Sequence, residues 1–184
     1  MVQRELVELA RNGDRDAFSA LAASVVDRLY ATAVLILRDH SMADDATQET
    51  IVRAWRDLPS LRDPDRFDAW LRRLLVNACH EEGRRERRRR PEMTLLPIHE
   101  PSVGDSSGAL ADRDALERGF RRLSSDHRAA VVLHHYLGLS MPEVADATGV
   151  ALGTAKSRLH HATRALRAAL EADARGGMTT GGTA

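Results

Sequence analysis

Two stretches of the chain concentrate basic residues in a pattern suited to binding phosphate. Residues 84–90 contain six Arg and one Glu, and residues 153–167 contain one Lys and three Arg without an acid. Arg and Lys neutralise the phosphates of nucleic acids, and such contacts give an affinity that falls as salt rises. The first stretch is also compatible with a solvated helix end, where Arg favours the negative end of the helix dipole.

A long helix is predicted to carry the first basic stretch. Asp63 and Pro64 form a helix start signal, and the pattern continues through residues 67–87. One face is apolar, with Phe67, Trp70, Leu71, Leu74, Leu75 and Ala78. The polar face carries Arg73, Asn77, Glu81, Arg84 and Arg88. Because Asn can make paired hydrogen bonds to a base edge, this face favours contact with nucleic acid over simple solvation.

The second basic stretch belongs to a predicted helix-turn-helix. Ser140 and Glu143 fit a capping box for a short helix over 142–148, Gly149 ends that helix, and a longer basic helix begins near Gly153. In this motif the N-terminal residues of the second helix enter the major groove. The residues in that position are Thr154, Lys156, Ser157, Arg158 and His161. The residues alone leave open a second interpretation, a solvated face in a helical bundle.

The elements that position these residues are predicted to form an all-α protein of two small helical domains. Residues 1–90 contain four helical patterns, including one capped by Asp14 and one starting at Ser41, and residues 109–172 contain four more. Between them, residues 91–108 hold three Pro, two Gly and three Ser, typical of a flexible linker. Such a linker spans roughly 20–25 Å as a coil and about 60 Å when extended, so it can hold the domains apart. Residues 173–184 are expected to form a disordered tail.

Composition excludes several classes of protein. The chain has 184 residues, of which 43% are hydrophobic, and its 27 basic and 27 acidic residues cancel to a net charge of zero. A single cysteine, Cys79, excludes a disulfide framework and a multi-cysteine zinc site. The longest apolar run, 33–37, is too short to cross a membrane, and the acidic N-terminus is unlike a signal peptide, so we expect a cytoplasmic protein without membrane insertion.

Catalysis is not predicted. The eight histidines include two adjacent pairs, but neighbouring residues on a helix point to different faces and do not converge on a metal. A glycine-rich phosphate loop, an HExxH motif and a nucleophile elbow are all missing from the sequence. We therefore expect a binding protein that has neither a metal nor another cofactor.

Three segments in series resemble the extracytoplasmic-function (ECF) sigma factors of bacterial RNA polymerase. The first holds Asp44, Asp45, Gln48 and Glu49 and ends in Arg53-Ala54-Trp55-Arg56. The second runs from Phe67-Asp68-Ala69-Trp70-Leu71 through Asn77 to the arginine run. The third joins Leu123-Ser124 and Arg128 to Leu139-Ser140, Glu143-Val144-Ala145 and Gly153-Thr154-Ala155-Lys156-Ser157-Arg158-Leu159. Together they cover roughly residues 10 to 170 in the family's order, and they match sigma regions 2 and 4.

The resemblance implies a role for each predicted surface. It places a contact with the β′ coiled coil of core RNA polymerase at Asp44, Asp45, Gln48, Glu49 and Arg53. It places recognition and melting of the −10 promoter element at Arg73, Asn77, Glu81, Arg84, Arg85 and Arg88. It places recognition of the −35 promoter element at Thr154, Lys156, Ser157, Arg158 and His161. The family also contacts the polymerase β flap through region 4, and an anti-sigma factor often holds its members inactive.

Two other interpretations stay open on the sequence alone. A stand-alone helix-turn-helix regulator would bind its operator tightly without polymerase, whereas the sigma interpretation predicts weak, salt-sensitive binding by the free chain. A polymerase-binding or anti-sigma protein that does not touch DNA would not need both basic helices.

Overall fold

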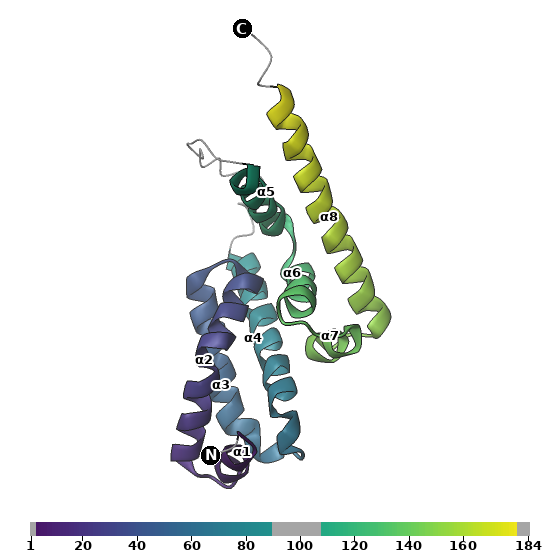
Figure 1. The fold of residues 1–184 in the computed structure, drawn as a ribbon. Coiled ribbons are helices and arrows are strands. Elements are labelled where there is room, and N and C mark those ends of the chain that lie inside the picture. The colour runs from purple at the N-terminus through teal and green to yellow at the C-terminus, as the bar shows by residue number, and fades with distance from the viewer. Residues whose placement is uncertain (1–2, 90–107, 180–184) are drawn as a thin grey trace.

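The computed structural model describes residues 3–89 and 108–179, with side chains described for 3–89 and 115–172. Every regular element in these ranges is a helix, which confirms the predicted all-α class. Figure 1 shows two groups of helices, α1 to α4 before the predicted linker and α5 to α8 after it. Apart from Gly108, which begins α5, the predicted linker lies outside the described residues.

The first group contains four helices, and side-chain caps set the starts of two of them. They are α1 (Gln3–Arg11), α2 (Arg15–Leu37), α3 (His40–Asp57) and α4 (Phe67–Arg89), with short 3₁₀ turns at Leu58–Ser60 and Pro64–Arg66. Asp14 caps α2 as predicted, because its Oδ1 accepts from the backbone N–H of Asp16 at 2.9 Å and of Ala17 at 3.0 Å. The start of α3 was predicted at Ser41, which is wrong: the carboxylate of Asp39 caps Met42 N at 2.9 Å, so the helix begins at His40.

The core of the first group is built by the apolar faces of α2, α3 and α4. Phe67, Leu71 and Leu75, all from the predicted apolar face of α4, are 2% exposed each. They pack in one cluster with Leu21 and Ile36 of α2. This packing fixes the rotation of α4 about its axis and thereby turns the Asn77 face away from the core.

By its length and mean hydropathy, one helix among the described residues, α2, could cross a bilayer. In the structure it is a core helix of the first group, because Leu21, Val25 and Leu29 are each no more than 4% exposed and lie in the same cluster as Phe67. Buried core helices of this kind meet the same length and hydropathy criterion as membrane spans.

The second group contains the predicted helix-turn-helix and a wide helical turn. Its helices are α5 (Gly108–Arg122), α6 (Ser125–Val131), α7 (Met141–Thr148) and α8 (Leu152–Thr179). Between α6 and α7 the chain forms a π-helical turn, Val132–Tyr136, in which Leu137 N donates to Val132 O at 3.0 Å. Helix α8 continues to Thr179, past the predicted start of the tail at residue 173, and residues 180–184 lie outside the described part.

The two groups pack against each other, whereas the linker length led us to expect separate domains. Helix α4 contacts α6 and α7, and α2 contacts α6. Val76 of α4 is fully buried in a cluster with Leu133 and Val144 of the second group. Ala129 and Val132 in turn join the core of the first group. Val76 lies beside the predicted apolar face of α4 and was not assigned to it, so this second apolar contact was not predicted.

Candidate nucleic-acid interface

The helix-turn-helix is held by local caps and a small apolar core. The Glu143 carboxylate accepts from Ser140 N at 2.8 Å and from the Ser140 hydroxyl at 2.6 Å, which confirms the predicted link between these two residues. Gly149 ends α7 in the left-handed region, with φ of 67°, where a side chain would be strained. Ala155 is buried against α7 at the start of α8, so the neighbouring positions of α8 are turned outward.

Four of the five predicted major-groove residues lie exposed on α8. They are Thr154, Lys156, Ser157 and His161. Hydroxyl, ammonium and imidazole groups on one helix end can all donate to base edges or phosphates. The structure therefore leaves these four side chains accessible near the N-terminal end of α8.

Arg158, the fifth residue, is directed back into the protein. Its side chain is 23% exposed, and Nη2 donates to Asp126 Oδ2 of α6 at 3.1 Å. Its Nη1 is buried and has no hydrogen-bond partner within the described residues. Asp126 therefore occupies a guanidinium that was predicted to contact DNA.

The residues of the predicted polar face of α4 differ in their exposure to solvent. Arg73, Arg84 and Arg88 are exposed, and Asn77 is half-buried among them. Arg85 is exposed as well, but its Nη1 donates to the buried carboxylate of Glu82 at 2.5 Å. The exposed guanidiniums can contact phosphates, and the Asn77 amide lies on the same helix where it could meet a base.

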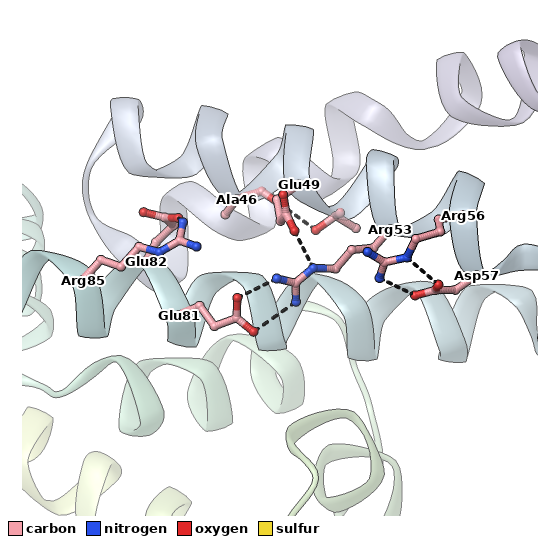
Figure 2. A network of polar contacts seen from close by, with 9 residues as sticks. Ala46, Glu49, Arg53, Arg56, Asp57, Glu81, Glu82 and Arg85 are labelled. Carbon is pink, nitrogen blue, oxygen red and sulfur yellow. Dashed lines mark hydrogen bonds and ion pairs between the residues drawn. The ribbon is translucent and has the colours of Figure 1, made fainter.

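Glu81 does not face solvent as a free member of that polar face. Arg53 of α3 donates to its two carboxylate oxygens at 3.0 and 2.6 Å and also donates to Glu49 at 2.6 Å, as Figure 2 shows. These hydrogen bonds lower the pKa of Glu81 and raise the pKa of Arg53 further above its usual range. A residue predicted for polymerase contact and one predicted for DNA contact are therefore joined in a single network between α3 and α4.

The other predicted polymerase-contact residues lie on the outer face of α3. Asp44, Asp45 and Gln48 are exposed, and Glu49 is half-buried beside Arg53. Two apolar side chains share this surface: Val52 is 59% exposed and Trp55 is 39% exposed. Trp55 contacts Phe18 at a ring-centroid distance of 4.9 Å and remains partly open to solvent. The exposed Val52 was missed, although its place within the polar face of α3 is visible in the sequence.

The described residues offer no obvious catalytic or metal centre. Among them, no three His, Cys, Asp or Glu side chains are placed to hold a metal ion. Burial raises the pKa of the Cys79 thiol to about 12, so the nucleophilic thiolate is suppressed at neutral pH.

Comparison with known proteins identifies both groups of helices. Residues 21–89 match sigma-70 region 2, and residues 113–166 match sigma-70 region 4. The ECF RNA polymerase sigma factor SigL of Mycobacterium tuberculosis is 34% identical over 169 residues, which cover 87% of this chain and 94% of that protein. The RNA polymerase sigma-H factor of Pseudomonas aeruginosa is 28% identical over 181 residues, covering 91% and 93% of the two chains.

Two solved structures share the fold over most of this chain. CnrH, solved in complex with the cytosolic domain of CnrY, is 27% identical and superposes with a TM-score of 0.65 over 93% of this chain and 98% of that one. The sigma factor RpoE of Bartonella quintana, solved in complex with the anti-sigma factor NepR, is 27% identical with a TM-score of 0.62 over 84% and 96%.

Proposed function

We propose that the two groups of helices in this chain have separate binding roles. The chain belongs to the ECF sigma factors of the sigma-70 family. The chain is an RNA polymerase sigma factor that directs transcription initiation at specific promoters. We call α1 to α4 region 2 and α5 to α8 region 4. The assignment of individual residues to polymerase and to the two promoter elements is our proposal.

Region 2 contacts core polymerase through the outer face of α3. Asp44, Asp45 and Gln48 supply exposed carboxylates and an amide, and Val52 and Trp55 supply apolar area within the same surface. A polar rim around exposed apolar side chains is typical of a protein interface. This composition supports binding to the β′ coiled coil, with Glu49 and Arg53 holding α3 and α4 in register.

Region 2 recognises the −10 element through α4. Asn77 pairs with an unstacked base, while Arg73, Arg84, Arg85 and Arg88 hold nearby phosphates. Extruding a base takes a few kcal/mol and is easiest where the duplex is already opening, so recognition and melting are coupled. Glu81 acts through Arg53 as a positioning residue rather than as a DNA contact.

Region 4 recognises the −35 element through α8 and meets the β flap through its first helices. The single observation that carries this proposal is the exposure of Thr154, Lys156, Ser157 and His161 at the N-terminal end of the second helix of a helix-turn-helix. Arg158 joins these residues once Asp126 releases it. The chain acts in the cytoplasm beside polymerase, without catalysis and without a cofactor, and an anti-sigma factor of the kind bound to RpoE regulates it.

Run-off transcription from a genomic promoter library with purified core enzyme tests the proposal and recovers the promoter sequence. Asn77→Ala should reduce open-complex formation on a recovered promoter while binding to core polymerase is retained in a pull-down. The matched control is Asn12→Ala, since Asn12 is an exposed asparagine of region 2 far from α4 in sequence. Loss of core binding in Asn77→Ala would refute the residue assignment. Nanomolar operator binding by the free chain at physiological salt would instead favour the stand-alone regulator.

A further inference from the structure

Helix α1 packs against the segment that joins α3 to α4. Val7 is fully buried and Ala10 is 3% exposed, and both lie in the core cluster of region 2. Figure 1 shows α1 at the end of region 2 where α4 begins, and α1 contacts both short 3₁₀ turns of the joining segment. We call residues 61–66 the entry loop of α4, because α4 begins directly after them at Phe67. Helix α1 carries none of the residues proposed to contact polymerase or DNA.

Two arginines of α1 bind the entry loop. Arg11 Nη1 donates to Leu61 O at 3.3 Å and to Arg62 O at 3.5 Å. Arg4 Nη1 donates to Asp65 Oδ2 at 2.6 Å. Attraction to the Asp65 carboxylate is the largest cause that raises the pKa of Arg4 above its usual range. Cations from one helix therefore contact the loop at its beginning and again near its end.

The hydrogen bonds within the entry loop are local. The Asp63 carboxylate accepts from Asp65 N at 3.0 Å, and Arg66 N donates to Asp63 O at 3.1 Å. Such bonds fix the shape of a turn, but they do not tie it to a distant part of the chain. The contacts from Arg11 and Arg4 do so, because they join residues 50 and 61 positions apart. Together with the buried side chain of Leu61, they set where the loop lies on region 2.

The entry loop and α4 line a common surface cleft. Among its lining residues are Arg62, Asp63 and Arg66 of the loop, Trp70 and Arg73 of α4, and Asp146 of α7. The three guanidiniums are exposed and outnumber the two carboxylates, so the cleft suits an anionic ligand such as a DNA phosphate. Because Arg73 belongs to the proposed −10 face, the loop extends that face beyond the N-terminal end of α4.

We propose that α1 is a brace for the entry loop, in which Arg4 and Arg11 hold Arg62 and Arg66 in line with the −10 face of α4. Arg62 and Arg66 add phosphate contacts to those made by α4. Arg4 and Arg11 act as positioning residues, because their guanidiniums donate to the loop itself. This inference rests on the proposed −10 role of α4.

Exchanging the charges of the Arg4–Asp65 pair in the full chain tests the brace. Arg4→Asp and Asp65→Arg each place like charges at this contact, and the double variant restores an ion pair in the opposite sense. A general electrostatic effect on DNA binding would have opposite signs in the two single variants, since one lowers and the other raises the net charge by the same amount. The brace instead predicts that both single variants impair open-complex formation, by roughly threefold to fivefold, and that the double variant recovers most of it.

The ion pair between Arg28 of α2 and Asp68 of α4 supplies the matched control. Its atoms are 3.0 Å apart, and its side chains are 58% and 38% exposed, against 55% and 62% for Arg4 and Asp65. The same charge exchange there should show no recovery of this kind, because neither residue belongs to the entry loop. Urea unfolding of every variant establishes that it is folded under the assay conditions. Opposite signs in the two Arg4–Asp65 single variants, or equal recovery in the control pair, would overturn the proposal.

Hydrogen exchange of the free chain tests the brace without promoter or polymerase. Arg11→Gln removes the cation that binds Leu61 O and Arg62 O, so the amides of residues 61–66 should exchange several-fold faster. Arg11→Lys keeps a cationic donor and should restore most of the protection. Arg15→Gln removes the same charge from an exposed position of α2 and should leave exchange in the loop unchanged. Equal exchange in Arg11→Gln and the wild type would show that α1 does not hold the loop.

The two measurements separate the brace from the proposed function. If Asn77→Ala impairs open-complex formation while Arg4→Asp and Asp65→Arg support it normally, the brace is refuted and the proposed function stands. If exchange is faster in Arg11→Gln and the charge exchange shows the expected recovery, but Asn77→Ala forms open complexes normally, the role proposed for Asn77 is refuted and the brace stands.

Discussion

Breaking the ion pair between Arg53 and Glu81 should destabilise region 2 through one measurable interaction. The pair joins α3 to α4 by two hydrogen bonds of 3.0 and 2.6 Å, and its side chains are 18% and 33% exposed. Two unit charges about 4 Å apart attract by about 4 kcal/mol at an effective dielectric constant of about 20. Desolvation of the two groups offsets most of this attraction.

The expected coupling energy between Arg53 and Glu81 is therefore about 1–2 kcal/mol, between the values for exposed ion pairs and for buried hydrogen bonds to charged groups. A loss of about 1.5 kcal/mol should lower Tm by roughly 3–6 °C in a chain of this size. The assay is urea unfolding at pH 7 of the wild type, Arg53→Gln, Glu81→Gln and the double variant, analysed as a double-mutant cycle.

The control cycle uses Arg56 and Asp57, which also form two hydrogen bonds, at 2.7 and 2.9 Å, but with Arg56 66% exposed. Solvent screening should make that coupling much smaller than the coupling between Arg53 and Glu81. If the coupling energy between Arg53 and Glu81 is no larger than that between Arg56 and Asp57, the reasoning that burial strengthens the Arg53–Glu81 pair is refuted.

The same cycle has a defined pH dependence. Hydrogen bonding from Arg53 is the largest cause that lowers the pKa of Glu81 below the usual 4.5. A carboxyl whose pKa is lower in the folded state contributes stability that is present above the unfolded pKa and lost as pH falls through the folded pKa. The coupling should therefore stay constant from about pH 8 to pH 6 and decline only below about pH 4.5.

Three further substitutions test other parts of the structure. Phe67→Ala should lower the free energy of unfolding by about 3–5 kcal/mol in urea, because Phe67 is 2% exposed in the region 2 core; a loss below about 1 kcal/mol would contradict that burial. Asp14→Ala should remove the cap of α2 and lower the free energy of unfolding by about 1 kcal/mol. Asp14→Asn should retain most of the stabilisation by the cap. Burial lowers the pKa of His80 below the usual 6.5, so its stabilising contribution is present above about pH 6.5 and is lost as pH falls. Wild type should then lose more stability than His80→Gln between pH 7 and pH 5, and parallel pH profiles would oppose the prediction.

The local features of the fold could be predicted because they depend on neighbouring residues. The caps at Asp14 and Ser140 and the helix end at Gly149 each involve contacts within a few residues, so type and spacing suffice to identify them. The start of α3 shows the limit of this approach. Asp39 and Ser41 are both good capping residues, and the sequence does not show which one reaches a free backbone N–H.

The pairing of distant charges could not be predicted. Arg53 and Glu81 are 28 positions apart, and Arg128 reaches a carbonyl 92 positions away, so both contacts depend on how the helices pack. The helical spacing of Glu81 correctly placed it on the polar face of α4, but that spacing could not show that α3 supplies a partner there. The same limit applies to Arg158, whose carboxylate partner lies on another helix.

The wide turn at Val132–Tyr136 makes the length of this segment matter more than its composition. It places one extra residue in the helical path between α6 and α7. Each helical residue rotates the chain by about 100°, so deleting a single residue here would rotate everything that follows, including the face of α8 with Lys156 and Ser157. Substitutions within the turn change individual side chains, whereas a one-residue deletion would redirect the whole DNA-reading module relative to the surface on which it rests.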